Sequence, residues 1–319
     1  MVRQEKEVRD VVVVGGGAAG LSAALMLARA RRRVTVVDAG APRNAAADGV
    51  HALLALDGVS PAELLARGRD EVIGYGGEIT AAEVIDVSAV SDGFAVRMRN
   101  GGVLRARRLL IATGLIDELP EIPGLRERWG REVVHCPYCH GWEVRDRLIG
   151  VLATGQMSVH QALLFRQWSG NLRYFSQGLE PSAEEQAKLA AVGIPVVAGG
   201  VTGLEAGDQR AIGVRLDDGR IVEVDVVALA SRMVARADVF SGIGIEPTEH
   251  PIGSYIAADR TGRTAVPGVW VAGNATDLSA QVSAASADGA RVAAQINADL
   301  VYEDTDRAVA RLAKAEAAR

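Results

Sequence analysis

Cysteine is scarce in this chain, since only two of its 319 residues are cysteines. Long apolar runs are missing as well, and none reaches the length that crosses a bilayer. Excess positive charge is also absent: the formal net charge is -5, which excludes a broadly basic face. We therefore expect no membrane and no nucleic acid as partners.

The first residues of the chain predict its cellular location, and its length predicts the number of domains. Residues 1–6 are charged and lead directly into a strand-like run, so no secretory signal is expected and a reducing cytoplasm is the predicted location. There a lone C-x-x-C pair indicates redox activity or metal binding rather than a structural bridge. A chain of 319 residues is long for one core, and two domains are expected.

Residues 10–38 have the pattern of a dinucleotide-binding βαβ unit. A β-branched run at 10–14 and a run at 33–37 predict parallel strands around a helix at 21–30. Gly15, Gly17 and Gly20 fit G-x-G-x-x-G between strand and helix, and Asp38 follows about 20 residues later. The glycines allow a pyrophosphate to approach, the helix start supplies N–H donors, and the acid suits a ribose hydroxyl.

The region after this unit is predicted to end the first half of one domain. Ser60-Pro61-Ala62-Glu63 is a capping box that opens a helix to about residue 74. Strands are predicted at 82–87, 94–99 and 103–111, the last ending in Ala112-Thr113-Gly114. Residues 119–124, with two prolines and a glycine, are the predicted crossing into a second domain.

A second, incomplete βαβ unit is predicted at 148–175, with a helix at 158–168 between two strands. Its turn carries Ala153, Gly155 and Ser158 where the motif has glycines, and a Cβ at the first position restricts the turn. Residues 176–178 offer neither an acid for a 2′-hydroxyl nor arginines for a 2′-phosphate. We predict a retained fold with weakened or lost nicotinamide binding; the alternative is weak binding through Gly155 and the helix start.

Later elements are predicted to return the chain to the first domain. Strands are expected at 212–216 and 221–229, and the return is expected near Glu246-Pro247. A strand then runs into Gly273-Asn274, followed by an Ala-rich helix at 280–300. The tail at 304–319 is a charged helix candidate with a solvated face.

The cysteines lie in the stretch His135-Cys136-Pro137-Tyr138-Cys139-His140, and their spacing carries the chemistry. Two such thiols can form a disulfide and pass electrons in pairs, and a helix start lowers a thiol pKa. His140 titrates near neutral pH and suits deprotonating an incoming thiol. These four cysteines and histidines could also bind zinc, but structural zinc sites usually take ligand pairs from two segments, and no second pair exists in the sequence. No metal site is therefore predicted.

The sequence leaves alternative roles for the residues that flank the cysteine pair. His135 is predicted to support the pair rather than to catalyse, and Trp142 to pack rather than to bind substrate. Glu143 either orients His140 or is simply exposed. Three further histidines have no partner visible in the sequence, and ordinary structural roles are favoured for His51, His160 and His250.

Taken together, these motifs resemble the low-molecular-weight thioredoxin reductase family of FAD-dependent pyridine nucleotide–disulfide oxidoreductases over nearly the whole chain. The stretch at 136–143, CPYCHGWE, is similar to the dithiol oxidase branch, whose members close the disulfide in products such as holomycin and gliotoxin with oxygen as acceptor. The resemblance implies an α/β fold of two Rossmann-like dinucleotide-binding domains (three-layer ββα type), the second inserted into the first. The FAD-binding domain would comprise 1–117 and 247–319, and the insert, which resembles an NADPH domain and carries the cysteines, 118–246.

The resemblance also implies the residues that would hold FAD. The ADP half would lie on the first glycine turn, next to 112–114, with 273–274 along the pyrophosphate and ribityl chain and 281–282 at the isoalloxazine edge. The loop at 51–58 could reach the thiol site in this branch. The implied FAD-binding residues are Gly15, Gly17, Ala18, Ala19, Gly20, Asp38, Ala112, Thr113, Gly114, Gly273, Asn274, Gln281 and Val282.

Three departures from the reductases indicate an oxidase. Reductases usually carry Asp at the positions of Asn274 and His140, and they carry a complete second glycine motif with a His-Arg-Arg element. We predict that a small dithiol attacks the disulfide at Cys136, that Cys139 passes two electrons to FAD, and that oxygen leaves as hydrogen peroxide. NADP(H) binding is doubtful, and the family implies a homodimer. Two alternatives stay open: an NAD(P)H-dependent reductase with a thioredoxin-like partner, and a flavin redox sensor without turnover.

Overall fold

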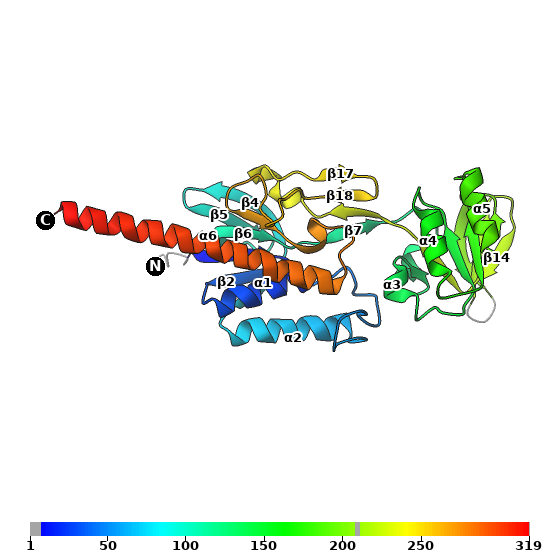
Figure 1. The fold of residues 1–319 in the computed structure, drawn as a ribbon, viewed down its shortest axis with the longest axis horizontal. Helices are drawn as coiled ribbons and strands as arrows, with labels where there is room; N and C mark the ends of the chain where they lie inside the picture. The colour runs from blue at the N-terminus through cyan, green and yellow to red at the C-terminus, as the bar shows by residue number, and fades with distance from the viewer. Residues whose placement is uncertain (1–7, 208–210, 319) are drawn as a thin grey trace. The chain divides into compact units, whose positions relative to one another are not determined.

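The protein is described by a computed structural model that covers residues 8–207 and 211–318 (Figure 1). The expectation for residues 1–6 lies outside this part of the chain. The chain divides into two compact units. Unit 1 comprises Met1–Ala45, Pro61–Ile116 and Met233–Arg319, and unit 2 comprises Ala46–Ser60 and Asp117–Arg232.

Unit 1 is built on a parallel sheet in the order β3-β2-β1-β6, with β19 also paired to β6. Val11 of β1 aligns with Val34 of β2 on one side and with Arg108 of β6 on the other. The strand centres are buried on both faces, as their β-branched runs predict. The strands are β1 (Arg9–Val14), β2 (Val34–Asp38), β3 (Glu78–Ala81), β6 (Val103–Ile111) and β19 (Val269–Val271).

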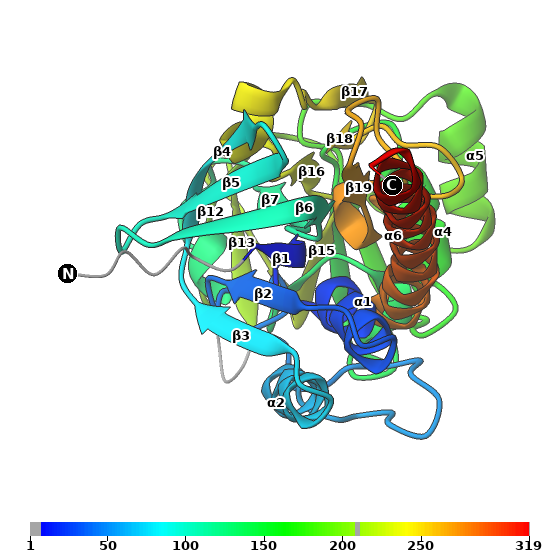
Figure 2. The same ribbon diagram turned by 90° about the vertical axis from the view of Figure 1, so that its left-hand side faces the viewer.

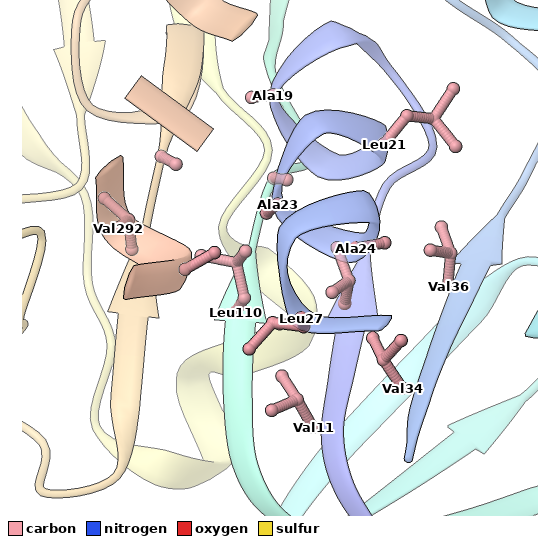
Figure 3. Packing of buried hydrophobic residues seen from close by; sticks show 14 of the residues in the cluster. Val11, Ala19, Leu21, Ala23, Ala24, Leu27, Val34, Val36, Leu110 and Val292 are labelled. Atoms are coloured by element: carbon pink, nitrogen blue, oxygen red, sulfur yellow. The ribbon is translucent and has the colours of Figure 1, made fainter. Parts of the chain in front are cut away.

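Helices α1 (Ala18–Arg29) and α6 (Val282–Ala317) pack together on one face of this sheet (Figure 2). The contact between them is made by small and branched side chains, among which Leu27 and Val292 are fully buried together with Leu110 of β6 (Figure 3). Helix α2 (Pro61–Gly74) lies against α1. This core fixes the start of α1 against the ends of β1 and β6.

The other face of the sheet carries a hairpin, β4 (Val84–Val90) and β5 (Gly93–Met98), which pairs antiparallel with β6. A 3-10 helix (Asp238–Ile243) packs on β4 and places Phe240 in a second core with Val12, Val14 and Phe94. Two β-layers and one helical layer result, so the predicted three-layer ββα class is confirmed.

Unit 2 repeats this scheme in smaller form. Its sheet is parallel throughout, in the order β11-β10-β9-β15-β8. Helices α4 (Ser158–Phe165) and α5 (Ala183–Ala191) accompany it, and α5 begins with the capping box Ser182–Glu185. A three-stranded antiparallel sheet completes the unit. The strands are β8 (Val133–Val134), β9 (Ile149–Leu152), β10 (Leu172–Phe175), β11 (Val196–Val197), β12 (Val201–Ala206), β13 (Ile212–Leu216), β14 (Ile221–Val224) and β15 (Val226–Leu229).

The boundaries between the units differ from the predicted ones. The chain leaves unit 1 within β7 (Leu115–Glu118) and returns within β16 (Arg232–Ala235), rather than near Glu246-Pro247. The earlier return follows from packing, because Phe240 belongs to the core of unit 1. Strands β17 (Thr248–His250) and β18 (Gly253–Tyr255) join β16 and β7 in one sheet. Residues 46–60, predicted with the first domain, group with unit 2.

Helix α6 is longer than predicted, because the expected helix at 280–300 and the charged tail are one continuous helix of 36 residues. Ion pairs hold its later turns to the sheet: Arg107 bonds Glu303 at 3.0 Å and Asp304 at 2.5 Å, and Arg32 bonds Asp304 at 2.6 Å. Within the described ranges, no helix combines the length and apolar character needed to span a bilayer.

Candidate functional site

The predicted ADP-binding turn lies where β1 passes into α1. Gly15 has a φ of 110°, and a Cβ there would overlap the carbonyl oxygen of Ala112, while a Cβ on Gly20 would overlap the carbonyl oxygen of Gly15. Helix α1 begins after Gly17, with Ala18 and Ala19 as its first residues and no side chain capping it. A Cβ on Gly17 would meet no described atom within 4 Å. The first N–H groups of α1 therefore face open space, as pyrophosphate binding requires.

Asp38 lies beside this turn at the end of β2. Its carboxyl carbon would be 2.6 Å from a Cβ on Gly16, so carboxylate and turn are neighbours. The carboxylate accepts a hydrogen bond from the Gly40 N–H at 3.1 Å and pairs with Arg69 of α2 at 2.9 Å. A carboxylate has about four acceptor positions, so these contacts leave room for a ribose hydroxyl. The contact with Arg69 joins residues 31 positions apart and was not predicted from the sequence.

The segment Ala112-Thr113-Gly114 continues from β6 at the same end of the sheet. The Ala112 N–H bonds the carbonyl of Val14 at 2.8 Å, and the Thr113 hydroxyl donates to the carbonyl of Arg236 at 2.9 Å. The Nε of Arg236 is buried with no hydrogen-bond partner among the described residues. A half-buried guanidinium with one unsatisfied buried donor next to this segment fits an anionic cofactor, and sequence reasoning did not find it.

The turn at Gly273-Asn274 is held from α6. Asp288 accepts the Gly273 N–H at 2.8 Å, and the side-chain NH2 of Asn274 donates to the carbonyls of Asp277 and Ala280 at 3.0 and 2.8 Å. Both amide hydrogens are thereby used, so only the amide oxygen of Asn274 is available to a ligand hydroxyl.

The adjacent start of α6 is the other predicted flavin contact. Gln281 precedes the helix, Val282 opens it, and no side chain caps it. Open N–H groups at this start, with the turns described above, give unit 1 the donors and acceptors that fit FAD. Which cofactor atom each residue contacts stays a prediction.

The two cysteines lie in unit 2, at a single helical turn after β8. Cys136 is the N-cap of α3 (Pro137–His140), and its carbonyl accepts the N–H groups of Cys139 at 3.2 Å and His140 at 3.1 Å. Both cysteines are half-buried and present as thiols. The turn holds the pair and the histidine in one compact group, as the motif predicts.

His140 is placed to act on protons. Burial lowers the pKa of His140 below its ordinary value of 6.5; the backbone of Cys136 and the carboxylate of Glu143 oppose this, and His51 adds to it. Its Nδ1 is buried without a hydrogen-bond partner among the residues described. A neutral imidazole at pH 7 is therefore available to accept a proton from a thiol.

A cavity of about 680 Å³ opens beside the pair. Cys139, His140 and Glu143 line it, and so does His51 from the separate segment 46–60. His51 Nε2 is 3.4 Å from Glu143 Oε1, and its Nδ1 is 3.5 Å from Asp57 Oδ2. The ordinary structural role favoured for His51 therefore needs revision. Of the two cysteines only Cys139 lines this cavity, whereas attack at Cys136 was predicted.

The remaining aromatic and histidine residues named in the sequence analysis have no direct part in the cavity beside the cysteines. Trp142 was predicted to pack, but its side chain is 64% exposed, with the guanidinium of Arg145 4.2 Å from its ring centre. His135 fits a supporting role, since its carbonyl accepts from Gln161 Nε2 at 2.6 Å. The exposed histidines His160 and His250 lie in α4 and β17. Across the described residues, no group of three or more His, Cys, Asp or Glu side chains is arranged to hold a metal ion.

At the second nucleotide turn, also in unit 2, two backbone donors are bonded within the protein. The buried hydroxyl of Ser158 accepts the N–H groups of Thr154 at 2.9 Å and Gly155 at 3.2 Å. These are donors that a pyrophosphate would need at this turn. The side chain of Gln177 is bonded to the backbone of Val201 through both its oxygen and its nitrogen. Two of the backbone donors at this turn are therefore already used within the protein, and weakened nicotinamide binding stays a prediction.

The chain is similar to known proteins over most of its length. The family described as "Pyridine nucleotide-disulphide oxidoreductase" matches residues 9–289. Thioredoxin reductase tcpT of Claviceps purpurea is 33% identical over 277 residues, covering 83% of this chain and 86% of that protein. Thioredoxin reductase aclD of Aspergillus oryzae is 27% identical over 312 residues, covering 92% and 97%.

Two solved structures are similar over nearly their whole length. HlmI is 46% identical with a TM-score of 0.90, covering 96% of this chain and 97% of that one. An oxidoreductase from Agrobacterium tumefaciens is 36% identical with a TM-score of 0.87, covering 93% and 99%.

Proposed function

Because the chain belongs to the pyridine nucleotide–disulphide oxidoreductase family, as a thioredoxin reductase-like oxidoreductase, we propose that it is an FAD-dependent dithiol oxidase. Family membership implies the flavin. The substrate would be a small dithiol in which the enzyme forms an intramolecular disulfide, with oxygen as the final acceptor and hydrogen peroxide as the second product. A reducing intracellular setting accords with this chemistry.

One observation carries the choice of oxidase over reductase: the occupied turn at Ser158. A reductase of this family draws electrons from a nicotinamide dinucleotide, whose pyrophosphate binds open N–H groups at such a turn. Here the Thr154 and Gly155 N–H groups are already bonded to the Ser158 hydroxyl. The electrons must then enter from elsewhere, and the cysteine pair is the other entry point.

The thiol site supports that entry. His140, kept neutral by burial, accepts the proton of a substrate thiol, and the resulting thiolate attacks one sulfur of the oxidised pair. The second substrate thiol then attacks the mixed disulfide, which closes the product ring and leaves Cys136 and Cys139 reduced. When bound, FAD supplies the two-electron acceptor that returns the pair to the disulfide.

Oxygen uptake with small dithiols tests the proposal. We expect uptake that needs no NADPH and that is abolished by Cys136→Ser and by Cys139→Ser. A thioredoxin-type reductase is the second candidate, favoured by the names of the fungal relatives. Anaerobic mixing with NADPH separates the two: rapid bleaching of the flavin would refute the oxidase in favour of the reductase. If the protein binds flavin but oxidises no dithiol, the alternative of a flavin redox sensor would remain.

A further inference from the structure

The segment 46–60 is a fixed wall of the thiol cavity. Its start is seated on Gly130, where φ is 83° and a Cβ would lie 2.7 Å from the Cβ of Ala46. Inside the segment, the Val50 N–H bonds the carbonyl of Val59 at 2.8 Å and closes a loop. The Ala52 N–H donates to Asp57 Oδ1 at 2.9 Å. These bonds hold His51 and Asp57 in one loop, although they lie far from the cysteines in sequence.

His51 stands between two carboxylates. Glu143 faces its Nε2 and Asp57 faces its Nδ1, at 3.4 and 3.5 Å. A neutral imidazole has one N–H and one bare nitrogen, and a bare nitrogen cannot bond a carboxylate. Each ring nitrogen of His51 thus has a carboxylate oxygen beside it, with which a proton could be exchanged. The exposed fraction of the side chain is 42% for Glu143, 25% for His51 and 69% for Asp57, so the half-buried imidazole lies between two carboxylates that both reach solvent.

The reaction creates a need for such a group. The first substrate thiol loses its proton as its sulfur bonds one cysteine, and the enzyme S–S bond breaks. The second loses its proton as the product S–S bond forms and the mixed disulfide breaks. The substrate thus gives up two electrons and two protons: the cysteine pair takes the electrons, and oxygen finally takes up two of each as hydrogen peroxide. His140 can hold only one of the two protons at a time.

Resting on the proposed oxidase function, we propose that Glu143, His51 and Asp57 form a proton-transfer path to solvent, which we call the proton outlet. It takes the proton from His140 between the two thiol attacks. Glu143 and His140 line the same cavity, and the Glu143 N–H bonds the His140 carbonyl at 3.1 Å. His51 is in this scheme a positioning and relay residue that acts through Glu143. The other charged groups on the cavity wall are Asp48, Arg128, Arg131, Glu132 and Arg147.

The test compares oxygen uptake by the FAD-loaded wild type and by His51→Gln with a small dithiol across pH 5.5–9 (about the range in which histidine titrates). We expect the variant to lose roughly 10-fold to 100-fold in kcat at pH 7. Glu143→Gln should lose as much. The loss in His51→Ala should be partly reversed by imidazole in the buffer, an effect that a purely structural role would not produce. Thermal melting and FAD content should stay at wild-type values.

The control is His250→Gln, an exposed histidine of unit 1 that lies outside the thiol cavity; it should keep wild-type kcat. If the wild type takes up no oxygen with any dithiol, the proposed function itself fails. If the wild type turns over and His51→Gln matches it in kcat and pH profile, the outlet alone is refuted. A slower His51→Ala that imidazole does not restore would refute it equally.

Discussion

Ser158→Ala is the substitution that most directly probes why the second nucleotide turn is closed. The Ser158 hydroxyl is buried and accepts two N–H groups, at 2.9 and 3.2 Å. Each bond contributes about 1 kcal/mol, and alanine regains about 0.5 kcal/mol of helix propensity, so we expect a net loss of about 1.5 kcal/mol. That corresponds to a melting point lower by roughly 3–6 °C.

Urea unfolding followed by tryptophan fluorescence measures this loss, since Trp129, Trp142 and Trp168 all lie in unit 2. Ser182→Ala, which removes an ordinary helix cap in the same unit, is the matched control and should lose about 1 kcal/mol. Anaerobic NADPH should bleach the flavin of neither variant, because residues 176–178 offer no group for a 2′-phosphate. An unchanged stability of Ser158→Ala would refute the reasoning, and so would fast bleaching of the wild type.

Three further predictions concern the other described contacts. His140→Gln should lower oxygen uptake roughly 100-fold; because burial lowers the pKa of His140, wild-type activity should fall to half its plateau only at a pH below the ordinary histidine value of 6.5, which a pH–rate profile checks. Asp38→Ala should weaken FAD binding about 10-fold or more, as measured by titrating apoprotein with FAD, whereas Arg69→Ala should change it little. Arg107→Gln removes one guanidinium from Asp10 and from Asp304, which keeps its bond to Arg32, and should destabilise unit 1 by about 2 kcal/mol in calorimetry; no change would contradict a stabilising role for this ion-pair network.

The elements that the sequence predicted best are those fixed by neighbouring residues. The strand, glycine turn and helix from Arg9 to Arg29 depend on local patterns, and the structure has them within a few residues of the prediction. The turn of α3 likewise follows from Pro137 beside the cysteines. Such features arise from backbone geometry that a short stretch determines alone.

What the sequence could not predict depends on distant partners. His51 and Glu143 are 92 positions apart, and nothing in either stretch specifies the other. The sequence showed that the second turn lacked two of the three motif glycines, but not that the hydroxyl of Ser158 bonds two of its donors. The return at β16 was also missed, because it is decided by where Phe240 is buried. Each of these is a tertiary contact with no local signature.

The discontinuity of unit 1 has a consequence for synthesis on the ribosome. Its first strand and helix emerge early, but β19 and α6, which complete their core, are the last parts made. Arg32 bonds Asn297, which lies 265 positions later in the chain. At about 5–20 residues per second, the nascent α1 waits for tens of seconds with its apolar face uncovered. Unit 2 has all its strands by Leu229 and can fold first, so the cysteine turn is formed before the flavin-binding unit is closed.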